Sequence, residues 1–202
     1  MKATILSSAT LAMLLATGSA SAQFYAAIGA GNTMPDSDNG VLAGADANVN
    51  DAWALSGNLG YRFSPSVFVD FSTGLTESGH SVRLAGLGEV ASLDQRPMTL
   101  SLNYQFLPDS KFRPYFSLGY GWNQVSNETT EGALSGLGIN VGNGSGFVWG
   151  GGADVVLNDN WFLRGDLKKM DFDAAVNIET LGNVGNAEVN PLYLQLSVGY
   201  QF

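Results

Sequence analysis

The chain of 202 residues has no cysteine, little charge and no long hydrophobic run. Without cysteine it forms neither disulfide bonds nor metal sites with thiolate ligands. No segment beyond the N-terminal region approaches the ~18 consecutive apolar residues of a membrane-spanning helix. Only 13% of the residues are charged, whereas ordinary soluble domains carry about 25%. The composition therefore disfavours both a soluble globular domain and a helical membrane protein.

The charges that are present are mostly acidic, and the formal net charge is −9. This balance disfavours a nucleic-acid partner, because binding to phosphates needs patches of Lys and Arg. The one histidine, His80, stands between Ser78 and Ser81 in a segment that we expect to be a loop. A Ser/His/acid arrangement is conceivable there, but a solvated side chain is favoured. We expect no enzyme activity, no cofactor and no metal site.

The N-terminus has the parts of a secretory signal peptide. Lys2 supplies a positive charge, residues 5–16 are largely apolar, and Ala20-Ser21-Ala22 fits the small-x-small cleavage pattern. The apolar part is too short to span a bilayer. We expect residues 1–22 to be removed on export and residues 23–202 to form a single domain.

The chain is rich in glycine and in alternation with a period of two residues. Its 26 glycines argue against helices. Apolar side chains occupy every second position of several segments, with small or polar side chains between them, and this pattern predicts strands. The four clearest segments are residues 52–63, 98–106, 114–122 and 192–202. Four weaker ones are residues 24–31, 67–75, 147–157 and 161–172.

The connections between these eight segments alternate strictly between long and short. The short ones are residues 64–66, 107–112 and 158–160, and the long ones are residues 32–51, 77–96, 124–143 and 173–190. Outer-membrane barrels show this rhythm of short periplasmic turns and longer extracellular loops. We therefore predict an all-β fold, an eight-stranded antiparallel transmembrane β-barrel with four long extracellular loops and three short periplasmic turns, in a Gram-negative outer membrane.

A soluble secreted sandwich or a lipocalin-like barrel would alternate in the same way. Its polar face would meet water, whereas the second face here consists mainly of Gly, Ser and Asn rather than charged residues. Aromatic residues also gather near both ends of the strands, as expected at two membrane interfaces. The membrane barrel is therefore favoured over the soluble one.

Several short motifs resemble those of the OmpW family of small outer-membrane barrels. They are residues 97–106, residues 111–115 with Gly119 and Gly121, residues 170–173, residues 190–191 and residues 198–202. The resemblance extends, with gaps, over residues 23–202. It implies a narrow, porin-like barrel that helps small hydrophobic molecules cross the outer membrane and releases them sideways into the bilayer. Lys168 and Lys169 stand where better-known members carry aromatic residues, so a gating role of that pair is not carried over.

The last residues resemble a signal that is general to outer-membrane barrels. Val198 and Tyr200 alternate with polar residues before the terminal Phe202. This pattern resembles the signal read by the barrel-assembly machinery. We expect that machinery as a partner during biogenesis, and outer-membrane lipid and lipopolysaccharide as surroundings.

The predicted inward face carries charges of both signs near the periplasmic turns. They are Arg62, Asp70, Arg113, Asp154, Arg164, Asp166 and Lys168. Charges so nearly balanced should pair, because an isolated buried charge costs several kcal/mol. The network then either only stiffens the barrel or also forms a floor that blocks the lumen toward the periplasm.

Higher in the lumen, the inward face becomes apolar. Val148, Met170, Phe172 and Tyr193 point inward there, and inward glycines such as Gly121 leave space beside them. Apolar residues that face a polar lumen depart from the expected pattern and are therefore informative. These four residues either pack against the long loops or form an apolar cup for a small hydrophobic guest.

Two functions remain open at this point. In the first, a hydrophobic molecule enters the cup, meets the floor and leaves sideways, and Gly150, Gly151 and Gly152 are candidates for a weak place in the wall because glycine weakens a strand. In the second, the barrel transports nothing and is a structural, adhesive or defence protein that acts through its long loops.

Overall fold

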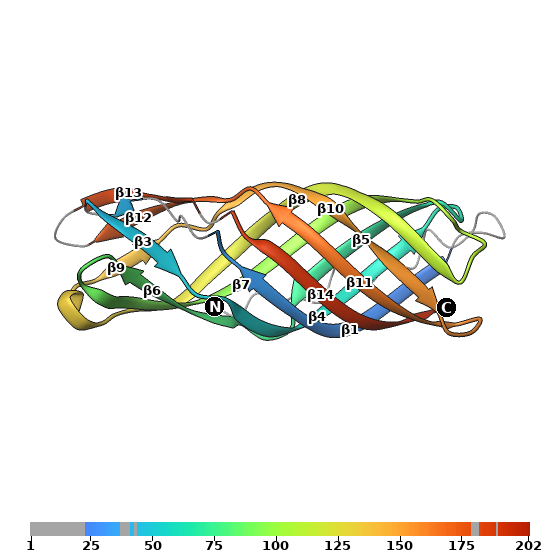
Figure 1. The fold of residues 1–202 in the computed structure, drawn as a ribbon, viewed down its shortest axis with the longest axis horizontal. Helices are drawn as coiled ribbons and strands as arrows, with labels where there is room; N and C mark the ends of the chain where they lie inside the picture. Colours follow the sequence, from blue (N-terminus) through green and yellow to red (C-terminus); the bar gives the residue numbers. More distant parts are fainter. Residues whose placement is uncertain (1–22, 37–40, 43, 179–181, 189) are drawn as a thin grey trace, which may run out of the picture.

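Eight strands of the computed structural model close into a barrel (Figure 1). The structure describes residues 23–36, 41–42, 44–178, 182–188 and 190–202, and the expected signal peptide lies outside them. The barrel strands are β1 (Gln23–Met34), β4 (Ala52–Arg62), β5 (Val67–Gly74), β7 (Gly88–Gln105), β8 (Phe112–Thr130), β10 (Ser145–Val156), β11 (Trp161–Met170) and β14 (Leu192–Gln201). Each pairs antiparallel with the next, and β14 pairs with β1 to complete the ring. The predicted fold class is confirmed.

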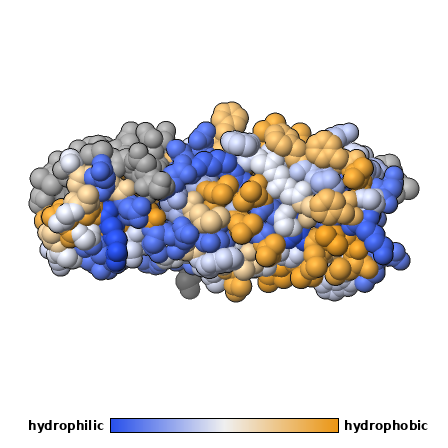
Figure 2. Space-filling model, viewed as in Figure 1, coloured by the Kyte–Doolittle hydropathy of each residue, from blue (hydrophilic) through white to orange (hydrophobic). Residues whose placement is uncertain are grey.

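The two-residue alternation separates a lipid-facing surface from the lumen. In β4, Trp53, Leu55 and Leu59 are more than half exposed, whereas Ser56 and Asn58 are buried. Because the ring is closed, every second side chain must point into a bore that eight strands leave only wide enough for side chains. Figure 2 shows the outward apolar residues gathered over the half of the molecule that contains the barrel strands.

The long connections are not simple loops, because much of their length forms strands. β7 and β8 run 18 and 19 residues, longer than the ~9–11 residues that cross a bilayer. The additional elements are β2 (Val41–Leu42), β3 (Ala45–Val49), β6 (Ser78–Leu84), the 3-10 helix η1 (Gly132–Leu134), β9 (Ile139–Val141), β12 (Asp173–Ile178) and β13 (Gly182–Glu188). Among the described residues, no helix is long and apolar enough to cross a membrane.

These additional elements share an apolar core of their own. Val49, Val82, Leu84 and Leu93 are among its buried members. β3 pairs with β6, and β6 pairs with the first half of β7. The expectation of long extracellular connections is thus confirmed, but their apolar positions pack together and continue the barrel wall beyond the membrane-facing strands.

β7 changes its partner at Pro97, one residue before the segment 98–106 that we predicted as a strand. β5 pairs with β7 up to Thr73 and Met98, and β6 pairs with β7 from Ser78 and Gln95. Pro97 therefore lies inside β7, at the junction between two partners. A proline is tolerated at this place because it removes a donor where the ladder is already interrupted.

Candidate functional site

A network of buried ion pairs crosses the lumen near the periplasmic turns. Asp154 accepts hydrogen bonds from Arg62 Nη2 at 2.6 Å and from Arg164 Nε at 2.7 Å. Arg164 Nη1 lies 3.2 Å from Asp70. Lys168 Nζ lies 3.8 Å from Asp70 and 3.6 Å from Asp166. In the described part of the chain, this network joins three cations to three carboxylates.

Six of the seven residues predicted for the charge network are brought together in this way, and Arg113 is not. Arg113 is half-buried, and its Nε donates to the carbonyl of Ser110 at 2.9 Å. No carboxylate among the described residues lies within ion-pair distance of Arg113. The reason is its position as the second residue of β8, where the side chain lines the pocket between the periplasmic turns rather than the centre of the barrel.

The Arg164 guanidinium is surrounded by aromatic rings that the sequence analysis did not single out. Its Cζ atom lies 4.7 to 5.3 Å from the ring centres of Tyr25, Phe68, Tyr115 and Phe162. These four residues form one buried cluster, here called the aromatic collar. Cation–π contacts of this kind strengthen when they are shielded from water. The collar replaces part of the hydration that Arg164 loses.

Two tyrosines of the collar also bind the carboxylates. The hydroxyl of Tyr25 donates to Asp70 at 2.5 Å and accepts from Arg164 Nη1 at 2.8 Å. The hydroxyl of Tyr115 donates to Asp166 at 2.5 Å. Both tyrosines occupy inward positions of their strands, so the alternation was the available signal. The charge network is therefore hydrogen-bonded as well as paired, as buried charges require.

The rings of the collar lie directly over glycines of neighbouring strands. A Cβ atom at Gly60 would overlap the ring of Tyr25, and one at Gly199 would overlap the ring of Phe162. These glycines therefore make room for side chains of the wall itself. The collar and the ion pairs together form one buried layer in the lumen, and this layer is here called the floor.

The predicted apolar cup residues do come together above the floor. Val148, Met170, Phe172 and Tyr193 form one cluster, and each is less than a tenth exposed. The space expected at Gly121 is occupied, because a Cβ atom there would lie 2.8 Å from both Val148 and Phe172. The apolar cluster is thus closed in this structure, and a guest would have to displace part of it.

The three glycines that we predicted as a weak place in the barrel wall lie in a fully paired segment of β10. Gly150, Gly151 and Gly152 pair with β11 on one side and with β8 on the other. The structure has no break in the wall at these residues. Their part in lateral opening stays a prediction.

The neighbouring lysines Lys168 and Lys169 point in opposite directions. Lys168 faces the lumen and is almost fully buried in the ion network. Lys169 faces outward, and its Nζ binds Asp36 at 2.7 Å, which ties β11 to the end of β1. The alternation of the strand explains the different roles of two adjacent identical residues.

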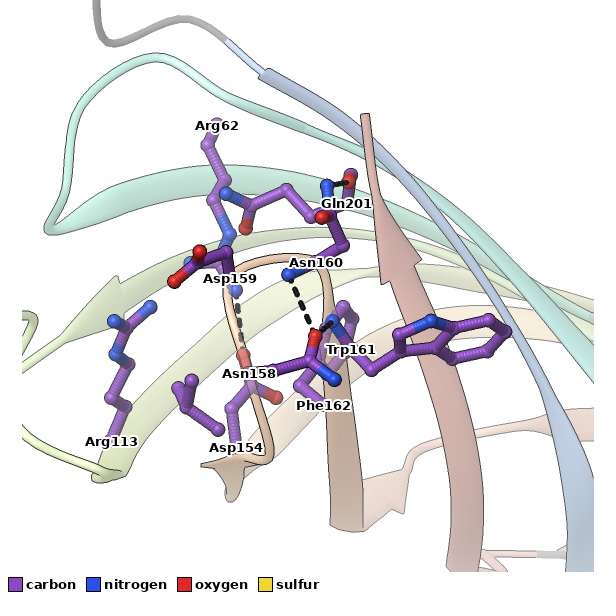
Figure 3. A pocket seen from close by; sticks show the side chains of 10 residues that line it. Arg62, Arg113, Asp154, Asn158, Asp159, Asn160, Trp161, Phe162 and Gln201 are labelled. Carbon is purple, nitrogen blue, oxygen red and sulfur yellow. Dashed lines mark hydrogen bonds and ion pairs between the residues drawn. The ribbon is translucent and has the colours of Figure 1, made fainter.

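Below the floor, a polar pocket of about 210 Å³ opens between the periplasmic turns. Figure 3 shows Arg62, Arg113, Asp154 and Asp159 around it, with Trp161 at its edge. The Arg62 side chain separates this pocket from the collar, because its guanidinium binds both Asp154 and Gln105. The pocket therefore ends at the floor.

His80 is buried, contrary to the expectation of a solvated loop residue. It is only 2% exposed, its Nδ1 lies 2.7 Å from the carbonyl oxygen of Asn50, and its Nε2 lies 3.2 Å from Ser78 Oγ. The reason is that residues 78–84 form strand β6, and the inward side chains of this strand are buried in the extracellular part. Burial lowers the pKa of His80.

Within the described ranges, no three His, Asp or Glu side chains gather in a way that could hold a metal ion.

The C-terminal residues complete the barrel. The Phe202 amide donates to the Phe24 carbonyl at 2.9 Å. The rings of Tyr200 and Phe202 lie edge to face at 5.1 Å, and Val198 and Phe202 are exposed on the outer surface. The segment that resembles an assembly signal is therefore accessible on the outside of the closing strand.

Comparison with known proteins agrees with this architecture. The sequence model of the OmpW family matches residues 20–202. Outer membrane protein AlkL of Ectopseudomonas oleovorans is 30% identical over 169 residues, which cover 81% of this chain and 72% of AlkL. The crystal structure of the outer membrane protein OprG from Pseudomonas aeruginosa aligns with a TM-score of 0.79 at 25% identity, covering 90% of this chain and 96% of OprG. The solid-state NMR structure of AlkL in DMPC lipid bilayers aligns with a TM-score of 0.67 at 26% identity over 92% of each chain. The protein is a bacterial outer-membrane β-barrel embedded in lipid, and it belongs to the OmpW family.

Proposed function

We propose that the protein helps small hydrophobic molecules cross the outer membrane, through the apolar cluster and then sideways into the bilayer. The observation that carries this proposal is the position of the apolar cluster directly above a closed, charged floor. A hydrophobic guest gains contacts at the cluster and would lose free energy in the floor, where charges are already paired and dry. Passage needs no catalytic step in this scheme.

The extracellular part supports access from outside. Its core contains Val49, Val82 and Leu93 and is a second apolar cluster, separate from that of Phe172 and Tyr193. A guest that leaves the lipopolysaccharide layer would therefore first meet an extracellular part that has apolar side chains of its own. Displacing Phe172 would open the cluster, because this residue follows the end of β11 instead of lying within a paired strand.

The partner change at Pro97 offers a better lateral exit than the glycines of β10. The amide of Gln105 donates to Ser66 on the β5 side, whereas the amide of Phe106 donates to Pro114 on the β8 side. Because these directions alternate along a strand, position 97 faces β5 and β6. Pro97 has no donor there, and β5 has already ended. An opening at this junction, where β5 has ended and β6 has not yet begun, thus breaks few hydrogen bonds.

Uptake of a labelled alkane by Gram-negative cells that lack their own family members tests the proposal. Phe172→Asp and Val148→Asp should each lower uptake toward the level of cells without the protein, because a charge enters the apolar cluster. Phe172→Leu is the matched control and should retain most of the uptake. Unchanged uptake in both Asp variants, with barrels that fold normally, would refute the apolar route.

The exit can be tested with a pair of engineered cysteines, since the chain has none of its own. Thr73 and Met98 are neighbours across β5 and β7, so Thr73→Cys with Met98→Cys should form a disulfide that stops uptake until it is reduced. Leu118→Cys with Trp149→Cys joins β8 to β10 beside the glycines and should not stop it. The reverse result would place the exit at Gly150, Gly151 and Gly152.

The rival function is that of a structural, adhesive or defence barrel. Trimming within residues 124–143 would remove the outer end of β8 together with η1 and β9. An adhesin should lose cell or matrix binding on this trimming, whereas a conduit should respond to changes in the lumen. We also propose that lipopolysaccharide surrounds the extracellular part and that the barrel-assembly machinery recognises residues 198–202.

A further inference from the structure

Three buried hydroxyl groups on one side of the lumen lack a hydrogen-bond partner among the described residues. They are Thr99 Oγ1 and Ser101 Oγ on β7, and Ser117 Oγ on β8. None of these side chains is more than 3% exposed. The Oδ1 atom of Asn103, the next inward residue of β7, is also without a partner. An unsatisfied buried polar group costs roughly 1–3 kcal/mol, so four neighbours of this kind call for an explanation.

Other inward polar side chains, on β4, β5 and β14, bind one another. Gln195 Nε2 donates to Ser56 at 2.9 Å and to Asn58 at 2.5 Å, and Asn58 Nδ2 donates to Asp70 at 2.9 Å. Ser72 Oγ reaches Gln195 Oε1 at 3.5 Å. Ser197 Oγ on β14 also lacks a partner, but the four atoms on β7 and β8 are neighbours of one another. Their residues are here called the hydroxyl wall (Thr99, Ser101, Asn103 and Ser117).

The hydroxyl wall adjoins the apolar cluster through two glycines. Gly119 pairs with Ser101 on one side and with Val148 on the other. Gly121 pairs with Thr99, and a Cβ atom there would meet Val148 and Phe172. On β8, glycine thus stands between the hydroxyl groups and the apolar residues. A guest that lies against the apolar cluster would therefore reach the hydroxyl wall with one end.

The charges nearby indicate what kind of polar end would fit. The ion network below contains three cations and three carboxylates, so it attracts neither sign strongly. Serine and threonine hydroxyls both donate and accept, and the Asn103 oxygen accepts. A neutral group that does the same, such as an alcohol, matches these atoms. A site that must hydrogen-bond its guest discriminates strongly against an analogue without that group.

We propose that the hydroxyl wall is a subsite for the neutral, hydrogen-bonding head of an amphipathic guest whose apolar body lies on the cluster of Val148, Met170, Phe172 and Tyr193. The protein then favours medium-chain alcohols over alkanes of equal length. This inference rests on the proposed function and specifies its substrate class.

Initial uptake of radiolabelled 1-octanol and n-octane by cells lacking their own family members tests it. The triple variant Thr99→Val, Ser101→Ala, Ser117→Ala removes the hydroxyls and nearly keeps the shape. After subtraction of the rate in cells without the protein, the ratio of octanol to octane uptake should fall at least threefold, with octane uptake unchanged. Ser72→Ala, which removes a buried hydroxyl that already has a partner in Gln195, is the matched control and should leave the ratio unchanged.

The outcomes separate the two proposals. An unchanged ratio in the folded triple variant overturns the subsite and means that the hydroxyls bind only water. An equal loss of both uptakes also overturns it, because the role is then structural. If the native protein raises neither uptake, the proposed function fails, and the subsite with it. If the triple variant does not assemble, the single variant Ser101→Ala is tested instead. The ratio of octanol to octane uptake should then fall by a smaller factor.

Discussion

Arg164 and Asp154 form a two-fold hydrogen-bonded pair in the centre of the barrel. Nε donates to Oδ1 at 2.7 Å and Nη2 donates to Oδ2 at 3.0 Å, and both side chains are about 1% exposed. This geometry fixes the planes of the two groups relative to each other. It also joins neighbouring strands β10 and β11, on which the two residues are partners.

Arg164→Met should destabilise the barrel strongly. It leaves the carboxylates of Asp154 and Asp70 with fewer partners in a dry layer, and breaking a buried pair from one side costs about 3–5 kcal/mol. Heat-induced unfolding in detergent, followed by the mobility shift on gels, measures the effect. Arg83→Met, which removes a pair whose arginine is 68% exposed, is the control and should change little. Equal effects of the two substitutions would contradict the assigned role of the network.

Opening the floor should raise ion conductance without changing apolar uptake. Asp154→Ala and Arg164→Ala each remove bulk and pairing from the layer that separates the lumen from the periplasmic pocket. Single-channel recordings in planar bilayers should show larger or more frequent conductance steps for either variant that folds. Uptake of an alkane should stay at the native level. A parallel change in both measurements would mean that guests pass through the floor.

Gly199→Ala should impair folding more than Gly165→Ala does. The added methyl group at Gly199 overlaps the packed ring of Phe162, whereas at Gly165 it makes an ordinary 3.5 Å contact with Leu196. Overpacking of this kind costs roughly 1–3 kcal/mol. The two glycines belong to adjacent strands, so the comparison is closely matched. Folding yield in lipid vesicles and the unfolding midpoint in urea provide the measurements.

Mild acid should loosen the extracellular strands around His80. Burial lowers the pKa of His80 in the folded protein, so the unfolded state binds the proton more readily. The stabilisation is fully present above the ordinary pKa of about 6.5 and is lost as the pH falls below it. The protection factors of amides in β6, which correct the exchange rate for its own dependence on pH, should therefore fall below about pH 6.5. His80→Gln should remove this pH dependence, and an unaltered profile in that variant would assign it to another group.

The barrel and its two faces were predictable because alternation is a local property of the sequence. Trp53 and Leu55 stand outside and Ser56 and Asn58 inside, as the period of two requires. The same rule placed Arg164 in the lumen. It did not reveal the aromatic collar, since which inward side chains meet across the bore depends on the stagger of all eight strands. The collar residues Tyr25 and Tyr115 come from β1 and β8, far apart in sequence.

The extracellular part was less predictable for a related reason. Val82, Leu84 and Leu93 alternate only over short stretches, and their burial depends on pairing between β3, β6 and β7. His80 appeared solvated because this pairing was not visible in the sequence. The inward positions of the apolar cluster followed from the alternation. The closed packing of this cluster was not predictable, because the contact of Phe172 with Gly121 depends on the path of the chain after β11.

The pairing of β1 with β14 has a consequence for how the molecule is made. These strands contain the first and the last described residues, and the amide of Phe202 bonds to Phe24. A chain shortened at either end therefore keeps two unpaired edges, which invite association with other strands. Closure of the cylinder thus requires both β1 and β14, since only a chain that contains both strands can hide both edges.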